Sequence, residues 1–177
     1  MIAAGLLAWT PVLPAAQIVS TAVTHEGRRY RVDFDVLLDA PAARLWPQLI
    51  DYEQLARLSE RVVEIRVLSA RHEPLRVFIA LRPCVLIFCR TIRRTVDVRP
   101  IEHGHILSLA DPQRGDFRYS LERWQLAPQG RRTRLRYQGE VEPRFFVPPL
   151  IGPWLIKRVV REELETTARK LEALAKP

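Results

Sequence analysis

The sequence predicts an α+β fold in which one curved antiparallel sheet of seven strands packs against a long C-terminal helix. Seven strand-like runs occur, and all but the first follow one another with short turns between them. This order argues against parallel strands joined by crossover helices. The apolar face of the sheet must be covered, and only the amphipathic segment at the end of the chain is long enough to do so.

The first strand and the two short helices after it are predicted from the spacing of apolar residues. Residues 29–36 alternate between apolar and charged side chains, which is typical of a half-buried strand. Apolar residues at helical spacing then predict one helix over residues 41–50, bent or shortened by Pro47, and a second over residues 52–58.

Six further runs predict the rest of the sheet. In one of them Tyr119 and Leu121 share a face while Trp124 and Leu126 share the other, so we expect a bulge near Glu122. The six runs cover residues 63–67, 75–81, 92–98, 106–109, 119–126 and 135–141.

The end of the chain changes character. Residues 143–153 are apolar and rich in proline, and residues 154–174 predict a long amphipathic helix.

The beginning of the chain predicts an exported protein. Residues 1–16 carry no charge and have the apolar length and small-residue end of a secretory leader, although a basic start is missing. We therefore divide the chain into a leader (1–16), an N-terminal arm (17–28) and one domain (29–177), located in the periplasm or secreted. The alternatives are an unstructured leader or an apolar arm packed on the domain, in a cytoplasmic protein.

Composition narrows the class of protein. Apolar residues make up 47% and charged residues 27% of the chain, which excludes wholesale disorder and a polytopic membrane protein. Lys and Arg number 28 against 20 Asp and Glu, giving a net charge of +8. This excess indicates either a solvated basic surface or attraction to an anionic partner.

Local motifs resemble one family. Asp39-Ala40-Pro41, Trp46 and Asp51-Tyr52-Glu53 stand where the coenzyme Q-binding and polyketide cyclase-like subfamily of the START-like (Bet v 1-like, SRPBCC) superfamily has an acidic residue plus Ala-Pro, an aromatic residue and Asp-Tyr-Glu. Residues 143–174 also resemble this subfamily, so the similarity covers residues 29–176, nearly the whole chain after the leader. The resemblance implies a helix-grip fold, with a sheet wrapped around the last helix.

The resemblance also implies an apolar cavity between the sheet and the helix. For each residue on its walls, ordinary core packing is the alternative. The expected ligand-binding residues are Val32, Phe34, Trp46, Val77, Ile79, Arg94, Val96, Leu121, Tyr137, Phe146, Ile151, Trp154, Leu155 and Val159.

Arg90 and Arg94 are the informative polar candidates because they share strand parity with the apolar Ile92, Val96 and Val98. If that face points inward, at least one guanidinium enters the interior and needs a partner, such as a ligand carboxylate, phosphate or quinone oxygen. The alternative is that a bulge or the strand end turns both to solvent. We expect another arginine group on the outer face: Arg131, Arg132, Arg134 and Arg136.

Cys84 and Cys89 are the only cysteines and flank four residues between two predicted strands. A hairpin would bring them face to face, so a disulfide is expected in an exported chain. In the cytosol they would be two buried thiols. The spacing is a poor zinc signature, and no nucleotide-binding loop or nucleophile motif occurs, so we expect no metal, cofactor or catalytic residue.

Three functions fit these features. The first is binding, and possible transport, of a hydrophobic or amphipathic small molecule such as a lipid, quinone or polyketide-like compound. The second is a cyclase or dehydrase that uses the same cavity, which would need a buried Asp, Glu, His or Tyr with a shifted pKa near an inward arginine. The third is a cytosolic protein like the ribosome-association toxins.

The partners follow from the first function. We expect a hydrophobic small-molecule ligand, no nucleic acid, and a monomer or weak dimer. The aromatic residues of segment 145–154, flanked by Arg144 and Lys157, indicate peripheral contact with an anionic membrane surface or, alternatively, a buried connection.

Overall fold

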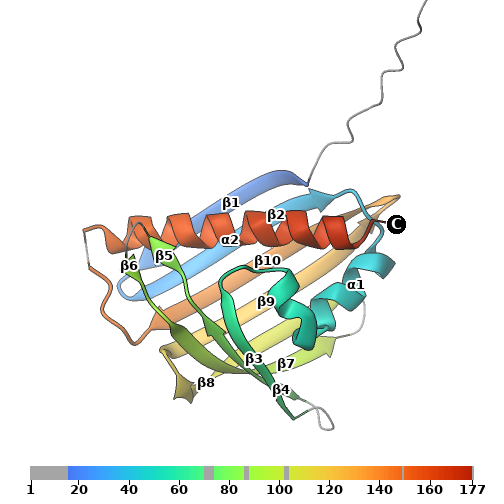
Figure 1. Cartoon of the computed structure of the whole chain (residues 1–177). Coiled ribbons are helices and arrows are strands. Elements are labelled where there is room, and N and C mark those ends of the chain that lie inside the picture. Colours follow the sequence, from blue (N-terminus) through green and yellow to red (C-terminus); the bar gives the residue numbers. More distant parts are fainter. Residues whose placement is uncertain (1–15, 70–73, 86–87, 102–103, 149, 177) are drawn as a thin grey trace, which may run out of the picture.

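The computed structural model describes residues 16–69, 74–85, 88–101, 104–148 and 150–176. It confirms the α+β class and the helix-grip arrangement: a curved antiparallel sheet partly surrounds the C-terminal helix (Figure 1). The sheet has eight strands, one more than predicted, in the order β1-β2-β10-β9-β8-β7-β4-β3, and β5 and β6 form a separate hairpin. The elements are β1 (Gln17–Glu26), β2 (Arg29–Leu38), α1 (Ala42–Ile50), η1 (Tyr52–Arg57), β3 (Val62–Ser69), β4 (Leu75–Leu81), β5 (Cys84–Val85), β6 (Phe88–Cys89), β7 (Ile92–Ile101), β8 (His105–Gly115), β9 (Phe117–Gln129), β10 (Arg132–Pro143) and α2 (Gly152–Leu174).

The additional strand is β1, in the region expected to be an N-terminal arm. It pairs antiparallel with β2, and Gly27, with a φ of 57°, supplies the left-handed residue of the turn between them. Most of its side chains are exposed, because β1 lies at the edge of the sheet. The expected leader, residues 1–16, lies outside the described residues except for Ala16.

The two predicted short helices are present as α1 and the 3₁₀ helix η1. Pro41 precedes α1 in an extended conformation, and Pro47 lies inside it. The Asp51 side chain accepts a hydrogen bond from the Gln54 backbone N–H at 3.3 Å, which caps the start of η1. These helices close one end of the curved sheet (Figure 1).

The core lies between the inner face of the sheet and α2. The inner face is continuous across the central strands, where Phe34 of β2 pairs with Tyr137 of β10, which pairs with Trp124 of β9. The buried residues of α2 lie mainly in its second half, including Leu164, Ala168 and Leu171, and the first half is mostly half-buried or exposed. One half of the helix therefore anchors it, and the other half packs more loosely.

The predicted bulge near Glu122 is wrong. β9 pairs with β10 without a register shift from Tyr119 to Gln129. Ser120, Glu122, Trp124 and Leu126 therefore share the inner face, and Tyr119 and Leu121 share the outer face.

No helix among the described residues is long and apolar enough to cross a membrane.

Candidate functional site

The inner face carries a small group of polar side chains in an otherwise apolar surface. Arg94 comes from β7, Glu122 from β9, Tyr137 from β10 and Tyr52 from η1, and we call these four the polar cluster. Strand parity brings the first three together: Arg94 alternates with the buried Val96, and Glu122 lies directly opposite Gly139 in the register of β9 and β10.

Arg94 and Glu122 form an ion pair with very little exposure to solvent. The Nη1 atom of Arg94 contacts Oε1 of Glu122, and its Nη2 donates to Oε2 at 3.3 Å. The two side chains are only 15% and 13% exposed. The expectation that Arg94 turns inward is confirmed, whereas Arg90 is exposed, with its guanidinium 4.5 Å from the centre of the Phe145 ring.

One N–H donor of the Arg94 guanidinium has no acceptor among the described residues. The Nε atom of Arg94 is buried and has no hydrogen-bond partner in the part of the chain that the structure describes. A buried N–H without an acceptor costs about 1–3 kcal/mol, so such a group marks a place where a ligand atom or a water molecule belongs.

The polar cluster keeps its tyrosines protonated. Burial, reinforced by the negative charge of Glu122, raises the pKa of Tyr137 well above its usual value and also raises the pKa of Tyr52. Burial opposes the charged form of Arg94, but the Glu122 carboxylate outweighs it and the pKa of Arg94 is raised. At neutral pH the cluster therefore holds one compensated charge pair and two phenol O–H groups.

Gly139 leaves room for the Tyr137 side chain because it has no Cβ atom. A Cβ atom at position 139 would lie 2.5 Å from the Tyr137 hydroxyl oxygen, so any larger residue would displace the phenol. The Tyr137 ring also contacts the Trp124 ring, with centroids 4.5 Å apart. The phenol thus lies over Gly139, on the side of the strand that faces Glu122.

The structure places most of the other expected ligand-binding residues around this cluster. Five of them are buried on the same inner face, Trp46 of α1 packs partly buried against them, and Leu155 and Val159 of α2 are half-buried. The five are Val32, Phe34, Val77, Ile79 and Val96.

Four of the expected residues do not lie there. The expectation that Leu121 faces inward is wrong, because the uninterrupted register of β9 puts it opposite Leu109 on the outer face. Phe146, Ile151 and Trp154 are mostly exposed and lie at the start of α2 or just before it, rather than inside the core. Sequence reasoning missed Glu122, Tyr52 and Trp124, although the i, i+2, i+4 spacing of Glu122, Trp124 and Leu126 contains the signal.

Two further polar predictions are confirmed, the disulfide and the outer-face position of Arg134 and Arg136. Cys84 and Cys89 form a disulfide across the β5–β6 hairpin. Arg134 pairs with Asp35 on the outer face at 2.6 Å, and Arg136 approaches the same carboxylate at 3.5 Å. No group of three potential metal ligands occurs among the described residues.

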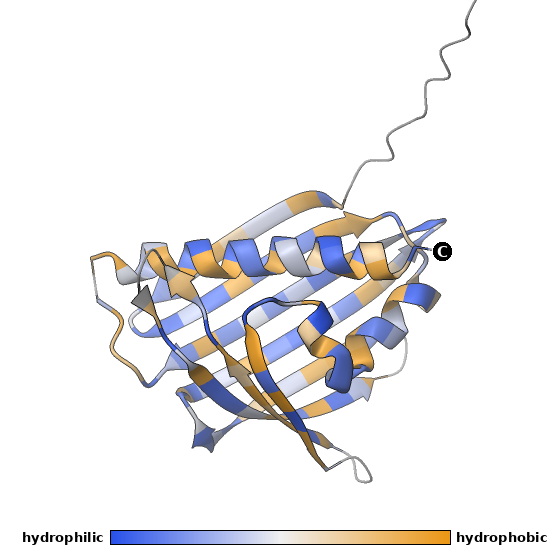
Figure 2. Ribbon diagram, viewed as in Figure 1, coloured by the Kyte–Doolittle hydropathy of each residue, from blue (hydrophilic) through white to orange (hydrophobic). Residues whose placement is uncertain are grey.

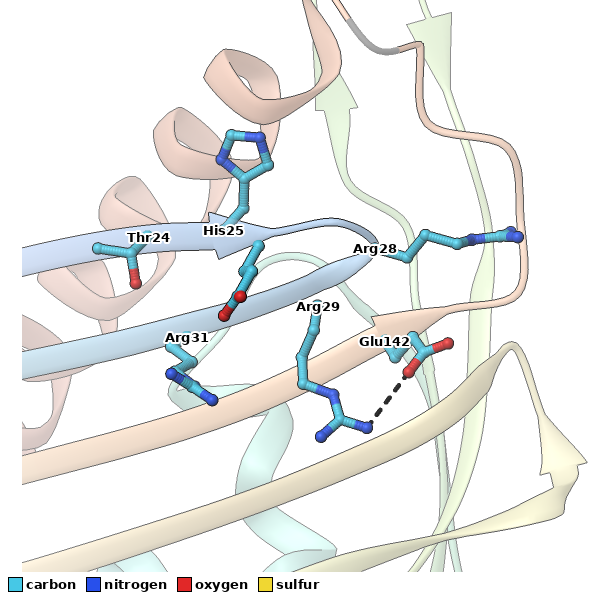
Figure 3. A pocket seen from close by; sticks show the side chains of 7 residues that line it. Thr24, His25, Arg28, Arg29, Arg31 and Glu142 are labelled. Carbon is cyan, nitrogen blue, oxygen red and sulfur yellow. Dashed lines mark hydrogen bonds and ion pairs between the residues drawn. The ribbon is translucent and has the colours of Figure 1, made fainter.

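Two hollows lie on the surface. One, of about 610 Å³, adjoins the β1–β2 turn and contains the Arg29–Glu142 ion pair (Figure 3). The other, of about 660 Å³, which we call the outer hollow, is lined mainly by outer-face side chains such as Arg123 and Arg136. Its lining also includes Phe34, Trp124 and Tyr137. Neither hollow includes a residue of α2, so the internal space between the sheet and the helix stays a prediction.

Comparison with known proteins places the chain in a family. The family described as polyketide cyclase / dehydrase and lipid transport matches residues 29–175. No curated protein matches the chain.

Solved structures share the fold at low sequence identity. A protein of Thermus thermophilus (TTHA0849) is 19% identical over 82% of this chain and 96% of its own, with a TM-score of 0.64. The ZhuI aromatase/cyclase of a Streptomyces species is 16% identical over 83% and 93%, with a TM-score of 0.66. A START superfamily protein of Mycobacterium smegmatis is 21% identical over 82% and 96%, with a TM-score of 0.65.

Proposed function

The chain belongs to the polyketide cyclase/dehydrase and lipid transport family, and on that premise we propose that it binds a hydrophobic small molecule with a neutral oxygen at one end. The apolar part of the ligand lies between the sheet and α2. Its oxygen accepts a hydrogen bond from Nε of Arg94. The observation that carries this proposal is the buried Nε–H without an acceptor among the described residues, beside a charge that Glu122 already compensates.

Charge balance favours a carbonyl or hydroxyl oxygen over a carboxylate or phosphate. Arg94 and Glu122 sum to zero, so an anionic ligand would leave one uncompensated negative charge in a site with little access to water. A neutral carbonyl accepts from Nε without adding charge, and the protonated Tyr137 can donate to the same oxygen.

Two matched probes test this proposal. Dihydroxyanthraquinone is neutral, and anthraquinone carboxylate is an anion of similar shape; binding of each is followed by quenching of tryptophan fluorescence. We expect the neutral probe to bind at least tenfold more tightly. The double variant R94M/E122L, which replaces the pair with apolar side chains, should bind the neutral probe about tenfold more weakly, because the Nε–H donor is lost, and should still reject the anion. Equal affinity of both probes for the parent, or an unchanged affinity of the neutral probe in the double variant, would contradict the proposal.

A second candidate function, cyclisation with loss of water, is favoured by the carboxylate of Glu122 lying beside the protonated Tyr137. Glu122 would take a proton from a carbon between two carbonyls, and that carbon would bond to a carbonyl carbon of the same molecule. Tyr137 would protonate the resulting alkoxide and recover its proton from Glu122. The hydroxyl would then leave as water with the second proton of the same carbon.

A synthetic poly-β-ketone thioester tests the second candidate. Turnover predicts a product lighter by one water in the mass spectrum, lost in the variant Y137F. A bound but unchanged compound would leave binding as the function.

We further propose that the protein works in an oxidising compartment, the periplasm or the outside of the cell. The Cys84–Cys89 disulfide supports this location, because such bonds persist there and are rare in the cytosol. Cell fractionation followed by N-terminal sequencing should recover a chain that begins near Gln17 outside the cytosol. Recovery of the chain from the cytosol with Met1 intact would contradict the proposal.

A further inference from the structure

Large apolar side chains are exposed at the end of the molecule where α2 begins. Phe146, Leu150, Ile151 and Trp154 are 78%, 94%, 58% and 57% exposed, and we call these four residues the apolar rim. Figure 2 shows the apolar character of the segment between β10 and α2. Soluble monomers seldom expose such a group in one short segment, and where they do it commonly marks an interaction surface.

The segment that carries the rim is held in place by its neighbours. The backbone N–H of Arg144 donates to Asp116 O at 2.8 Å, and its guanidinium donates to Phe117 O at 3.2 Å. The Phe145 ring contacts the Arg90 guanidinium and packs edge-to-face with the Phe117 ring. Because Phe145 is fixed on the protein side, the next residue is directed to solvent.

The last turn before α2 is also packed. The Gly152 backbone N–H donates to Pro148 O at 2.7 Å, and a Cβ atom at position 152 would lie 2.2 Å from a methyl group of Val147. Gly152 is therefore needed for this close approach, and the adjoining Ile151 and Trp154 project outward.

Positive charges surround the rim. Arg28 in the β1–β2 turn, Arg90, Arg144 and Lys157 have no carboxylate within ion-pair distance in the described part of the chain. The β1–β2 turn lies at the same end of the molecule as the rim, and Figure 3 shows the Arg28 side chain extending away from the sheet.

Acidic residues at this end do not cancel these charges. Glu26 ends β1, and the Asp116 carboxylate accepts a hydrogen bond from the Arg93 backbone N–H at 2.7 Å. Glu142 lies at the same end but pairs with Arg29, and Asp111 lies near Arg76 and Arg114. The two remaining carboxylates, Glu26 and Asp116, stand against the four cations that surround the rim, with Arg93 exposed as a fifth. The end of the molecule is therefore positive as well as apolar.

We propose that the apolar rim and its cations dock the protein on an anionic phospholipid bilayer. The rim side chains enter the boundary between headgroups and acyl chains, where tryptophan is favoured, and the arginines and Lys157 contact lipid phosphates. Charge complementarity selects this partner over a second copy of the chain, since two copies would each bring a net charge of +8.

Docking in this orientation would place the loosely packed half of α2 against the membrane. Leu155 and Val159 of that half are only half-buried, whereas the fully buried side chains begin at Leu164. A path for a ligand between the bilayer and the interior would start here. This last step rests on the proposed function, but the docking itself does not.

Vesicle co-sedimentation tests the docking. The parent protein should bind vesicles of phosphatidylcholine mixed with phosphatidylglycerol and bind pure phosphatidylcholine weakly. The variant F146S/L150S/W154S should lower the partition coefficient by about tenfold or more. The variant R28Q/K157Q should lower it by about 25-fold at low salt, since each cation near an anionic surface contributes about fivefold.

Matched controls separate the rim from the rest of the surface. V63S/L68S removes two exposed apolar side chains of β3, and R57Q/R131Q removes two exposed cations elsewhere; both should bind like the parent. Circular dichroism confirms that every variant is folded. Parent-like binding by the rim variant, or no binding of the parent to anionic vesicles, would overturn the proposal. So would a parent dimer in size-exclusion chromatography that the rim variant converts to a monomer.

Discussion

Replacing Glu122 with glutamine removes the carboxylate that compensates the buried charge of Arg94. Arg94 stays protonated in the variant, because a guanidinium does not lose its proton in a protein at neutral pH, and its side chain is only 15% exposed. Breaking one side of a buried ion pair costs about 3–5 kcal/mol, and the residual exposure places E122Q near the lower end, at about 3 kcal/mol. With a urea m-value of about 2 kcal/mol/M, the unfolding midpoint should fall by about 1.5 M.

Urea unfolding followed by tryptophan fluorescence measures this shift, with E64Q as the matched control. The Glu64–Arg66 pair has the same chemistry, but its side chains are 49% and 61% exposed, so its loss should move the midpoint by no more than about 0.25 M. The double variant R94M/E122L should unfold at or above the parent midpoint, because apolar side chains then replace both charges. If E122Q and E64Q shift the midpoint equally, the reasoning about burial is refuted.

Three further predictions follow from other parts of the structure. G139A should lower the free energy of unfolding by about 1–3 kcal/mol and weaken binding of the neutral probe, because the new methyl group displaces the Tyr137 phenol; an unchanged urea midpoint would contradict this. Stability should fall as the pH drops below about 4, because hydrogen bonds from Arg134 lower the pKa of Asp35 below its usual 3.8 in the folded state. The variant D35N should flatten that decline in a series of urea titrations at different pH values. Replacing both cysteines by serine should cost about 2 kcal/mol or less, since the closed loop is short and the hairpin is separate from the main sheet; a melting temperature lowered by tens of degrees would contradict this.

The architecture could be predicted because most strands keep a clean apolar alternation. Burial alternates throughout β2 and from Thr133 to Gly139 in β10, and the apolar neighbours of Arg94 at positions 92, 96 and 98 fix the face on which it lies. The sequence does not predict β1 as a strand because most of its side chains are exposed, and an edge strand of this kind leaves little hydrophobic pattern.

The polar cluster could be predicted only in part. Glu122 occupies a position where alternation calls for an apolar side chain, and this produces the false bulge in β9 and the wrong face for Leu121. A charged side chain on the inner face breaks the alternation of apolar and polar residues along β9. The fold tolerates it because Arg94, on a strand separated from β9 by β8, compensates the charge. A contact between residues 28 positions apart depends on the register of the sheet, which the local sequence does not specify.

The most direct test of ligand binding at the polar cluster is the NMR signal of the Arg94 Nε–H group. The signal is assigned by its absence in R94K, which has no such group, and is followed while dihydroxyanthraquinone is added. We predict that the chemical shift of this signal changes to a plateau as the neutral probe is added and changes very little with anthraquinone carboxylate. A saturating probe that shifts the signals of Arg123 and Arg136 in the outer hollow, and leaves Arg94 unchanged, would contradict the account.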